Sequence, residues 1–427
     1  MSDLIHLSAS EAARMIARRE LSSEELVTAH LDHIARRDEA VRAWAYLSAD
    51  DAIRQAQARD RNPAVGPLHG VPVGIKDMTD THDMPTSYGS PIYAGHRPVA
   101  DAVPVALLRA AGAVILGKTV TTEFAFRHPG PTRNPHDPER TPGGSSSGSA
   151  AAVADCQVPV ATGTQSGGSI IRPAAFCGVV GFKPTFDAIS TQGTKQLAWS
   201  LDTFGLFARS IDDIALFLAV MTGSPSAAVD ASHIHAPRIG LCQTSVWHQA
   251  DDAARAAVET AARRLAAEGA RVIDVELPSE ARDIQEIHRA IIGFEMNIAL
   301  SDERLRNADR LSIEMREQGL PMGAAVSFEE YQRCRDNAEA ARRALGSLFD
   351  DFDALITPSA VGEASLGLNS TGSAVFSNAW SILHVPCLAL PTGSGPNGLP
   401  IGIQLVGKRG EERDLLNLSE WVSRRLA

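Results

Sequence analysis

The sequence predicts an α/β protein in which a mixed β-sheet is sandwiched between helical layers. Two observations support this prediction. Short apolar runs with the length of buried strands recur along the chain, and they alternate with longer segments whose apolar residues have helical spacing. The alternation extends from residue 8 to residue 425, with no internal repeat and no apolar run long enough for a transmembrane helix. We therefore expect a layered protein that has no membrane partner.

The first half of the chain is expected to begin with two short helices within residues 8–36. Ser8 and Ser22 precede their apolar positions and are N-cap candidates, and Glu11 follows Ser8 at the spacing of a capping box. The next expected elements, in order, are a strand at 71–75, a helix near 101–111, a strand at 113–116 and helices at 149–154 and 211–222.

The second half is expected to follow a linker or surface crossover at 223–237, where proline, glycine and serine are frequent. The expected elements after it are a strand at 238–242, a helix at 251–268, a strand at 271–277, a long helical stretch to about 349, strands at 354–357, 387–390 and 401–406, and a helix at 412–425. The long stretch is charged and rich in arginine, so we expect a solvated outer layer there rather than a site.

Composition and charge exclude several classes of protein. The 427 residues are 44% hydrophobic and 21% charged, as in an ordinary globular protein, and they carry a net charge of −11. Such a charge disfavours a nucleic-acid partner, which requires a basic patch. The polar N-terminus resembles no secretory signal, and the five scattered cysteines form no CxxC pair. We expect a cytoplasmic protein with reduced thiols.

Two Gly-Gly-Ser turns and an isolated lysine are the most informative features. The turns Gly143–Ser145 and Gly167–Ser169 place their serines 24 residues apart. Lys76 ends the apolar run 71–75 in a chain that otherwise uses arginine for nearly all its basic residues. Lysine can lose its proton when buried, whereas arginine stays charged. The two serines and the lysine therefore indicate a hydrolase that uses a serine nucleophile without a histidine base. The alternative is that the strand-end lysine extends its amino group to solvent.

Competing motifs fit the sequence less well. Gly143 and Gly148 have the spacing of a phosphate-binding loop, but Ser149 stands where that loop needs lysine. The G-x-S-x-G pattern around Ser146 lacks the preceding buried strand of a nucleophile elbow. The histidines show no metal-ligand spacing. Ser169, in contrast, has a context that suits a nucleophile. The successive glycine N–H groups of the tight turn before it can point at one spot and bind an oxyanion. We expect no metal and no cofactor.

The sequence resembles the amidase signature family. The segments that carry the resemblance are 70–90 (GVPVGIKDMTDTHDMPTSYGS), 112–124, 134–154, 163–185 and 399–406 (LPIGIQLV). Within the family it is most similar to malonamidase-type enzymes. The resemblance implies the amidase signature fold in a single domain spanning 1–427, with N-terminal helices at 8–60, a signature core at 65–222 and a helical and α/β second half at 238–427. It also implies a homodimer.

The resemblance implies a Ser–cis-Ser–Lys triad. Ser169 matches the family nucleophile, Ser145 matches the serine that follows a cis peptide bond, and Lys76 matches the lysine. The 24-residue separation selects Ser145 among three consecutive serines. In the implied mechanism, neutral Lys76 takes a proton from Ser145, Ser145 deprotonates Ser169, and Ser169 forms an acyl-enzyme that water hydrolyses.

Backbone N–H groups near Ser166, Gly167 and Gly168 match those that bind the oxyanion. Three positions depart from the commoner family pattern. Gln165 replaces a frequent aspartate, Ser166 a frequent threonine and Ser147 a frequent glycine. Gln165 could alter the hydrogen bonding of the turn, but the malonamidase-like subgroup has a similar glutamine.

Arg172 matches the arginine that binds the substrate carboxylate in malonamidase-like enzymes, and a guanidinium suits a carboxylate well. The alternative is a structural ion pair with an acidic neighbour. Pocket walls are expected from loops after Lys76 and around Trp199 and from the helical region 280–330.

The expected function is hydrolysis of a C–N amide bond, with a small amide as substrate. One alternative is a carbamate (urethane), ester or aryl-amide hydrolase with the same triad. A second alternative is a subunit of an amidotransferase that works on a tRNA-bound substrate, which the acidic charge and the malonamidase-like motifs disfavour. A purely structural role would require the lysine and both serines to coincide by chance.

Overall fold

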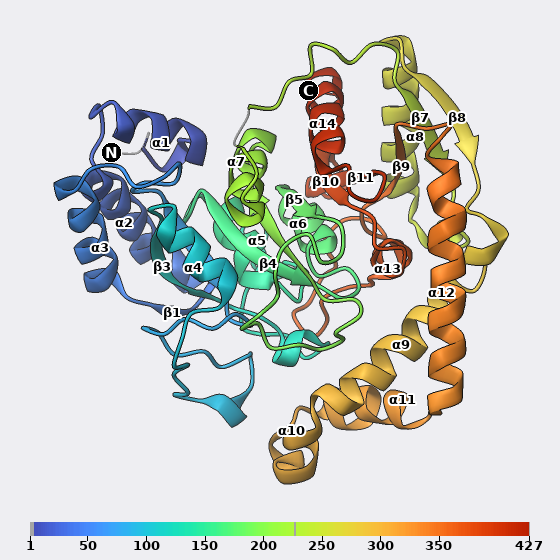
Figure 1. The fold of residues 1–427 in the computed structure, drawn as a ribbon, viewed down its shortest axis with the longest axis horizontal. Helices are drawn as coiled ribbons and strands as arrows, with labels where there is room; N and C mark the ends of the chain where they lie inside the picture. Colours follow the sequence, from blue (N-terminus) through green and yellow to red (C-terminus); the bar gives the residue numbers. More distant parts are fainter. Residues whose placement is uncertain (1–3, 226–227, 427) are drawn as a thin grey trace.

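The computed structural model describes residues 4–225 and 228–426, and within these residues eleven strands form one sheet (Figure 1). The predicted linker at 223–237 therefore falls partly outside the described residues, as does the start of the N-terminal segment. In sheet order the strands are β1 (Trp44–Leu47), β3 (Val114–Thr119), β2 (Pro72–Lys76), β4 (Val160–Gln165), β6 (Thr203–Ala208), β5 (Val180–Lys183), β10 (Cys387–Ser394), β11 (Pro400–Val406), β9 (Ala354–Pro358), β7 (Arg238–Cys242) and β8 (Arg271–Val275).

The sheet is mixed, and its parallel pairs position the site. β2 pairs in parallel with both β3 and β4, and β7 pairs in parallel with β8 and β9, whereas the other neighbours are antiparallel. The carboxyl ends of parallel strands meet at one edge of a sheet. Lys76 ends β2 and Gln165 ends β4. The strand-end lysine and the second glycine turn are thus brought to the same edge.

Helices cover both faces of the sheet, as the sequence predicted. Two buried hydrophobic clusters lie on the two faces. Successive residues of β3 show this, since Val114 and Leu116 belong to the first cluster and Ile115 belongs to the second. The first cluster includes side chains of α2 (Ser23–Val41), α3 (Ala49–Arg61), α5 (Ser147–Ala154), α6 (Ile171–Cys177), α9 (Ile284–Ala299), α12 (Phe328–Leu348) and α13 (Val375–Ile382). The second includes side chains of α4 (Val103–Ala110), α7 (Ile211–Thr222), α8 (Asp252–Ala267) and α14 (Glu412–Leu426).

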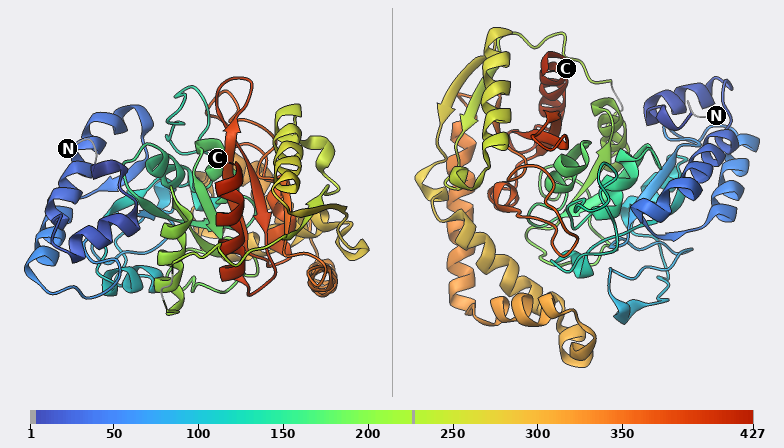
Figure 2. Two further views of the ribbon diagram at one scale, coloured as in Figure 1. Left: turned by 90° about the horizontal axis from the view of Figure 1, so that it is seen from above. Right: turned by 180° about the vertical axis from the view of Figure 1, so that it is seen from behind.

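The predicted long helical stretch to about 349 is broken into several helices. It contains α9, α10 (Ser301–Arg306), a π-helical turn at Met315–Gly319, α11 (Leu320–Ala324) and α12, which extend along the lower and right-hand border of Figure 1 and are seen from two other directions in Figure 2. The prediction that the whole stretch is a solvated layer is wrong for α9. Its side chains Ile284, Ile287 and Ile291 are buried in the first cluster, because the apolar positions of the stretch recur at helical spacing despite its arginines.

Most predicted elements are present within a few residues of their expected bounds. The two N-terminal helices are α1 (Ala9–Ala17) and α2, and both Ser8 and Ser22 form capping boxes. The sequence reading missed β1, β4, β5, β6, α6 and α13 as separate elements. β4 has the sequence VATGTQ, in which threonine, glycine and glutamine leave no apolar run to recognise, although every residue of the strand is buried.

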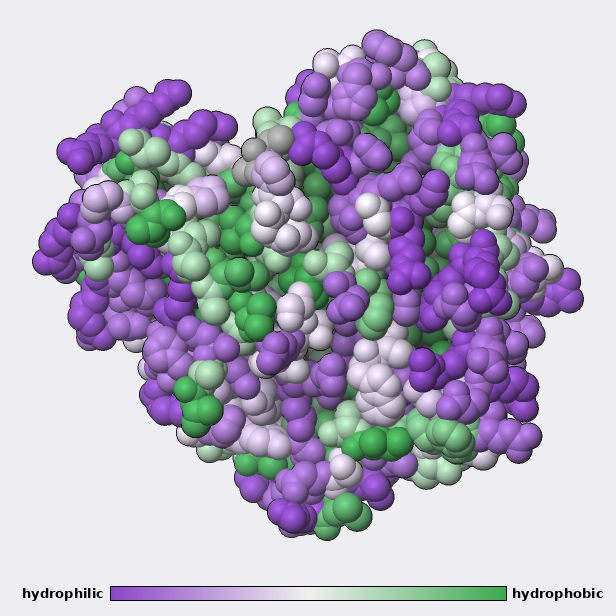
Figure 3. Space-filling model, viewed as in Figure 1, coloured by the Kyte–Doolittle hydropathy of each residue, from purple (hydrophilic) through white to green (hydrophobic). Residues whose placement is uncertain are grey.

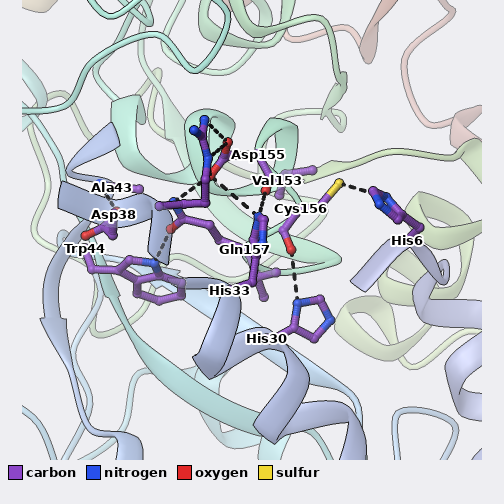
Figure 4. A network of polar contacts seen from close by, with 12 residues as sticks. His6, His30, His33, Asp38, Ala43, Trp44, Val153, Asp155, Cys156 and Gln157 are labelled. Atoms are coloured by element: carbon purple, nitrogen blue, oxygen red, sulfur yellow. Dashed lines mark hydrogen bonds and ion pairs between the residues drawn. The ribbon is translucent and has the colours of Figure 1, made fainter. Parts of the chain in front are cut away.

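A polar network fixes the C-terminal end of α5, whose N-terminal end follows Ser145 (Figure 4). Asp155 accepts hydrogen bonds from the Arg37 guanidinium of α2, with Nη2 to Oδ1 at 2.7 Å. The His33 Nε2 lies 2.7 Å from the carbonyl oxygen of Asp155, and the Trp44 indole donates to Gln157 over 2.7 Å. Helix α2 and strand β1 therefore hold in place the helix that follows the first serine turn.

Hydrophilic side chains cover most of the face shown in Figure 3, and hydrophobic ones show in patches between them. No helix in the part of the chain that the structure describes combines the length and the hydropathy of a membrane span.

Candidate active site

Lys76 is completely buried at the carboxyl end of β2. Its Nζ lies 2.7 Å from Ser145 Oγ and 2.7 Å from Thr164 Oγ1, with the Thr164 carbonyl oxygen at 3.4 Å. Burial lowers the pKa of the Lys76 amine well below its usual value, and the charge of Asp202 opposes this only in part. A neutral amine has two N–H groups for the Thr164 oxygens and one lone pair for the Ser145 hydroxyl. The contacts of Lys76 thus match those of a base for Ser145.

Ser145 follows a cis peptide bond with Gly144 and precedes α5. It is buried, as are the two serines after it. Ser146 Oγ lies 3.4 Å from the Thr164 carbonyl oxygen, and Ser147 Oγ lies 3.4 Å from the Ser145 carbonyl oxygen. Of the three consecutive serines, Ser145 is the one whose hydroxyl contacts the Lys76 amine.

Ser169 lies in the turn between β4 and α6 and faces a cavity of about 690 Å³. The two glycine turns touch, since the Ser146 N–H donates to the Ser169 carbonyl oxygen over 3.4 Å. Ser169 is 8% exposed, and its hydroxyl has no hydrogen-bond partner among the residues that the structure describes. The structure therefore brings Lys76 and Ser145 into contact and places Ser169 beside them at the cavity wall.

The carbonyl groups of the Ser166–Gly168 turn are held by side chains. His288 Nε2, on α9, lies 3.0 Å from the Ser166 oxygen, and the Ser381 hydroxyl donates to the Gly167 oxygen over 2.8 Å. The backbone N–H groups of Gly167, Gly168 and Ser169 have no acceptor in the described part of the chain. Unpaired N–H groups at a cavity wall are the donors that an oxyanion needs.

Asp202 also stabilises the Ser166–Gly168 turn. Its carboxylate accepts a short hydrogen bond from the Ser166 hydroxyl and others from the N–H groups of Leu197 (2.7 Å) and Ala198 (3.1 Å). Burial raises the pKa of Asp202 to about 6, against the effect of these donors. Asp202 thus links the turn to β6 and supplies a negative charge near Lys76.

Gln165, the residue in place of the family's frequent aspartate, caps α6. Its Oε1 accepts from the N–H groups of Ile170 (2.9 Å) and Ile171 (3.1 Å), and its Nε2 lies 3.3 Å from Ser381 Oγ. A carboxamide oxygen can satisfy helix N-terminal donors as a carboxylate does. The glutamine therefore preserves the cap without adding a negative charge.

Arg172 makes no ion pair among the described residues, so the alternative of a structural ion pair with an acidic neighbour is wrong. Its guanidinium donates to the carbonyl oxygens of Gly144 (2.5 Å) and Gly372 (3.0 Å) and to the Thr371 hydroxyl (3.2 Å). Burial, with the nearby charge of Arg127, lowers the pKa of Arg172 to about 10, so the group stays charged at neutral pH. Arg172 therefore fixes the cis peptide and leaves a buried positive charge at the cavity wall.

The cavity has an excess of positive charge. Arg127, Arg172 and Arg289 line it, and the acidic side chain in its wall, Glu314, pairs with His128 over 2.8 Å. Part of the wall comes from 280–330, as the sequence predicted, and part from residues 369–378. The predicted contribution from the loop around Trp199 is made by Leu197. The loop just after Lys76 was also predicted to form part of the wall, but none of its residues lines the cavity.

The sequence matches the amidase family over residues 25–416. The chain belongs to the amidase family. Among curated relatives, a glutamyl-tRNA(Gln) amidotransferase subunit from Acidothermus cellulolyticus is 35% identical, with 95% of this chain and 92% of the relative covered. Among solved structures, native peptide amidase from Stenotrophomonas maltophilia is 31% identical (TM-score 0.83; 98% and 96% covered), and 6-aminohexanoate cyclic dimer hydrolase is 26% identical (TM-score 0.87; 99% and 98% covered).

Several residues of this amidase site were not identified from the sequence. Thr164 precedes the predicted turn in β4 and contacts Lys76, and Asp202 lies within the motif WSLDTFG without an assigned role. His288 and Ser381 come from distant helices, α9 and α13. Asp202 could have been suspected, because Leu201 and Phe204 flank it closely and a buried aspartate needs partners. No local signal marks the other two.

Proposed function

We propose that this amidase-family enzyme hydrolyses amides through Lys76, Ser145 and Ser169. The observation that carries the proposal is the contact of a buried lysine amine, whose pKa is lowered, with the hydroxyl of a serine after a cis peptide bond. A lysine that stayed charged in the same place would need a carboxylate partner or exposure to water. Lys76 has neither, because its contacts are a serine and a threonine.

In the proposed mechanism, the neutral Lys76 amine accepts the Ser145 proton while Ser145 accepts the proton of Ser169. Ser169 Oγ forms a bond to the amide carbonyl carbon, and the N–H groups of Gly167 and Gly168 stabilise the oxyanion. The C–N bond then breaks as Ser145 gives a proton to the leaving nitrogen and regains one from the protonated Lys76 amine. Water attacks the acyl-enzyme with the same proton transfers, which releases the acid and restores the Ser169 hydroxyl.

We further propose that the substrate is a small amide with a carboxylate, as for malonamidase-type enzymes. Arg172 supports this proposal because it is a buried cation at the cavity wall with no carboxylate partner in the described chain. Arg127 and Arg289 extend the positive charge toward the exposed part of the cavity. A local positive field can attract an acidic substrate to a protein whose net charge is −11.

The substrate comparison uses malonamate and an isostere whose carboxylate is replaced by a methyl ketone. We expect kcat/KM to favour the acid by about 100-fold, near the roughly 3 kcal/mol of a charge-assisted hydrogen bond. The enzyme is kept constant and the substrate is varied, because replacing Arg172 would also release the Gly144 carbonyl. Equal rates, or turnover of bulky aryl amides or carbamates alone, would contradict a carboxylate-bearing substrate and favour the urethane, ester or aryl-amide alternative.

The curated relatives favour a second candidate, a role as the ammonia-supplying part of an amidotransferase. The relative from Acidothermus cellulolyticus is named as an amidotransferase subunit and aligns with nearly the whole chain. Ammonia release by the purified chain with a free amide, in the absence of other proteins and tRNA, supports the autonomous enzyme. Activity that appears only with partner proteins would favour the amidotransferase role.

A further inference from the structure

The side chain of Asn378, on α13, has an unpaired oxygen at the cavity wall. Its Oδ1 is buried and has no hydrogen-bond partner in the described part of the chain. Buried acceptors are nearly always paired, so an unpaired one in a substrate cavity points to a donor on the ligand. No step of the proposed mechanism uses this oxygen.

The orientation of the Asn378 carboxamide follows from its neighbours. The Val375 carbonyl oxygen can only accept, so Gln285 must direct its Nε2 toward it, and the two atoms lie 3.0 Å apart. Gln285 Oε1 then faces Asn378 and can only accept, so Asn378 directs Nδ2 toward it over 2.9 Å. These hydrogen bonds fix the orientation of the Asn378 carboxamide and leave its Oδ1 without a hydrogen-bond partner in the described chain.

Asn378 Oδ1 lies against the turn that precedes Ser169. A Cβ atom added to Gly167 would be 3.0 Å from this oxygen, so the oxygen lies close to the glycine turn. Gly167 and Ser169 line the same cavity, and their N–H groups are among the unpaired donors described above. The free acceptor and the free donors thus lie on the same part of the cavity wall.

We propose that Asn378 Oδ1 accepts a hydrogen bond from the nitrogen of the reacting amide and makes the site selective for substrates with an N–H group there. This inference rests on the proposed amide hydrolysis. A primary amide or a carbamate with an N–H group supplies the donor. An ester places an oxygen with lone pairs opposite Oδ1, and an N,N-dimethyl amide has no N–H to offer. Sites that hydrogen-bond a substrate N–H discriminate strongly against analogues that lack it.

The test compares kcat/KM for an amide with that for the matching ester. The two pairs are malonamate with monomethyl malonate and benzamide with methyl benzoate, and the pair that the wild type hydrolyses is used. Asn378→Ala is expected to lower the amide value about 10-fold, the effect of one hydrogen bond to a buried group, and to leave the ester value unchanged. Asn337→Ala is the matched control, because Asn337, on α12, is exposed, its side chain makes no hydrogen bond within the described chain, and it does not line the cavity. It should leave the amide-to-ester ratio as in the wild type.

A second variant, Gln285→Leu, keeps the inference testable if Asn378→Ala folds poorly. It removes the group that orients Asn378, so it should lower the same ratio while leaving Oδ1 present. Equal losses for amide and ester in both variants would overturn the role of Asn378 but leave amide hydrolysis intact. Failure of the wild type to hydrolyse either amide would instead overturn the proposed function, and this inference with it.

Discussion

Replacing Ser169 with alanine is expected to abolish amide hydrolysis, with ammonia release at the level of the uncatalysed reaction. The substitution removes the oxygen proposed to form the acyl-enzyme, and the other hydroxyl of this turn, that of Ser166, already donates to Asp202. Loss of a nucleophile usually costs about 10⁶-fold in kcat. Ammonia release from a turned-over amide measures the effect directly.

Ser147→Ala is the matched control for Ser169→Ala. Ser147 is also buried near the cis peptide, but its hydroxyl contacts only the Ser145 carbonyl oxygen, over 3.4 Å. This variant should retain most of the wild-type rate. If Ser169→Ala retained a near-wild-type rate, Ser169 could not be the nucleophile.

Replacing Lys76 with methionine is expected to lower kcat/KM by about 10³-fold or more, because Ser145 then has no base. Lys76→Arg should be impaired to a similar degree, since arginine keeps its proton and cannot accept another. The arginine variant separates a base from a mere positive charge. Retention of activity in Lys76→Arg would contradict the assignment, and thermal unfolding of both variants checks that the fold persists.

The pH profile of the wild type gives a second measurement on Lys76. Burial lowers the pKa of the amine, so the neutral form is present above that lowered value and lost as the pH falls through it. We expect kcat/KM to fall as the pH drops through that lowered value, because protonated Lys76 can no longer act as a base. Activity should be retained well below the usual pKa of lysine.

The layered fold was predictable because most strands and helices follow hydrophobic periodicity. Strands β2 and β3 are short apolar runs, and their burial matches the pattern. β4 escaped recognition because its small and polar residues are buried through neighbouring strands and helices rather than through their own hydrophobicity. Its parallel pairing with β2 is nevertheless what joins Lys76 to the second glycine turn.

The residues of the site were predictable to a similar extent. Two glycine turns and a strand-end lysine indicated Lys76 and Ser145, which are in contact, and Ser169, which lies on the neighbouring turn at the cavity wall. The contacts of Asp202, His288 and Asn378 were not predictable, because they depend on how distant helices and loops pack against one turn. Arg172 was expected to bind either a substrate or an acid, and its partners within the described chain are two backbone carbonyls and the Thr371 hydroxyl, which no sequence pattern reveals.

The central claim is that this chain cleaves amides through an acyl-enzyme on Ser169. The most direct measurement is the mass of the purified protein after rapid acid quenching during turnover of an amide or its ester. We predict an increase equal to the acyl group, assigned to Ser169 by fragmentation and removed by hydroxylamine. A covalent adduct on Ser145, or turnover with no adduct in either reaction, would contradict the claim.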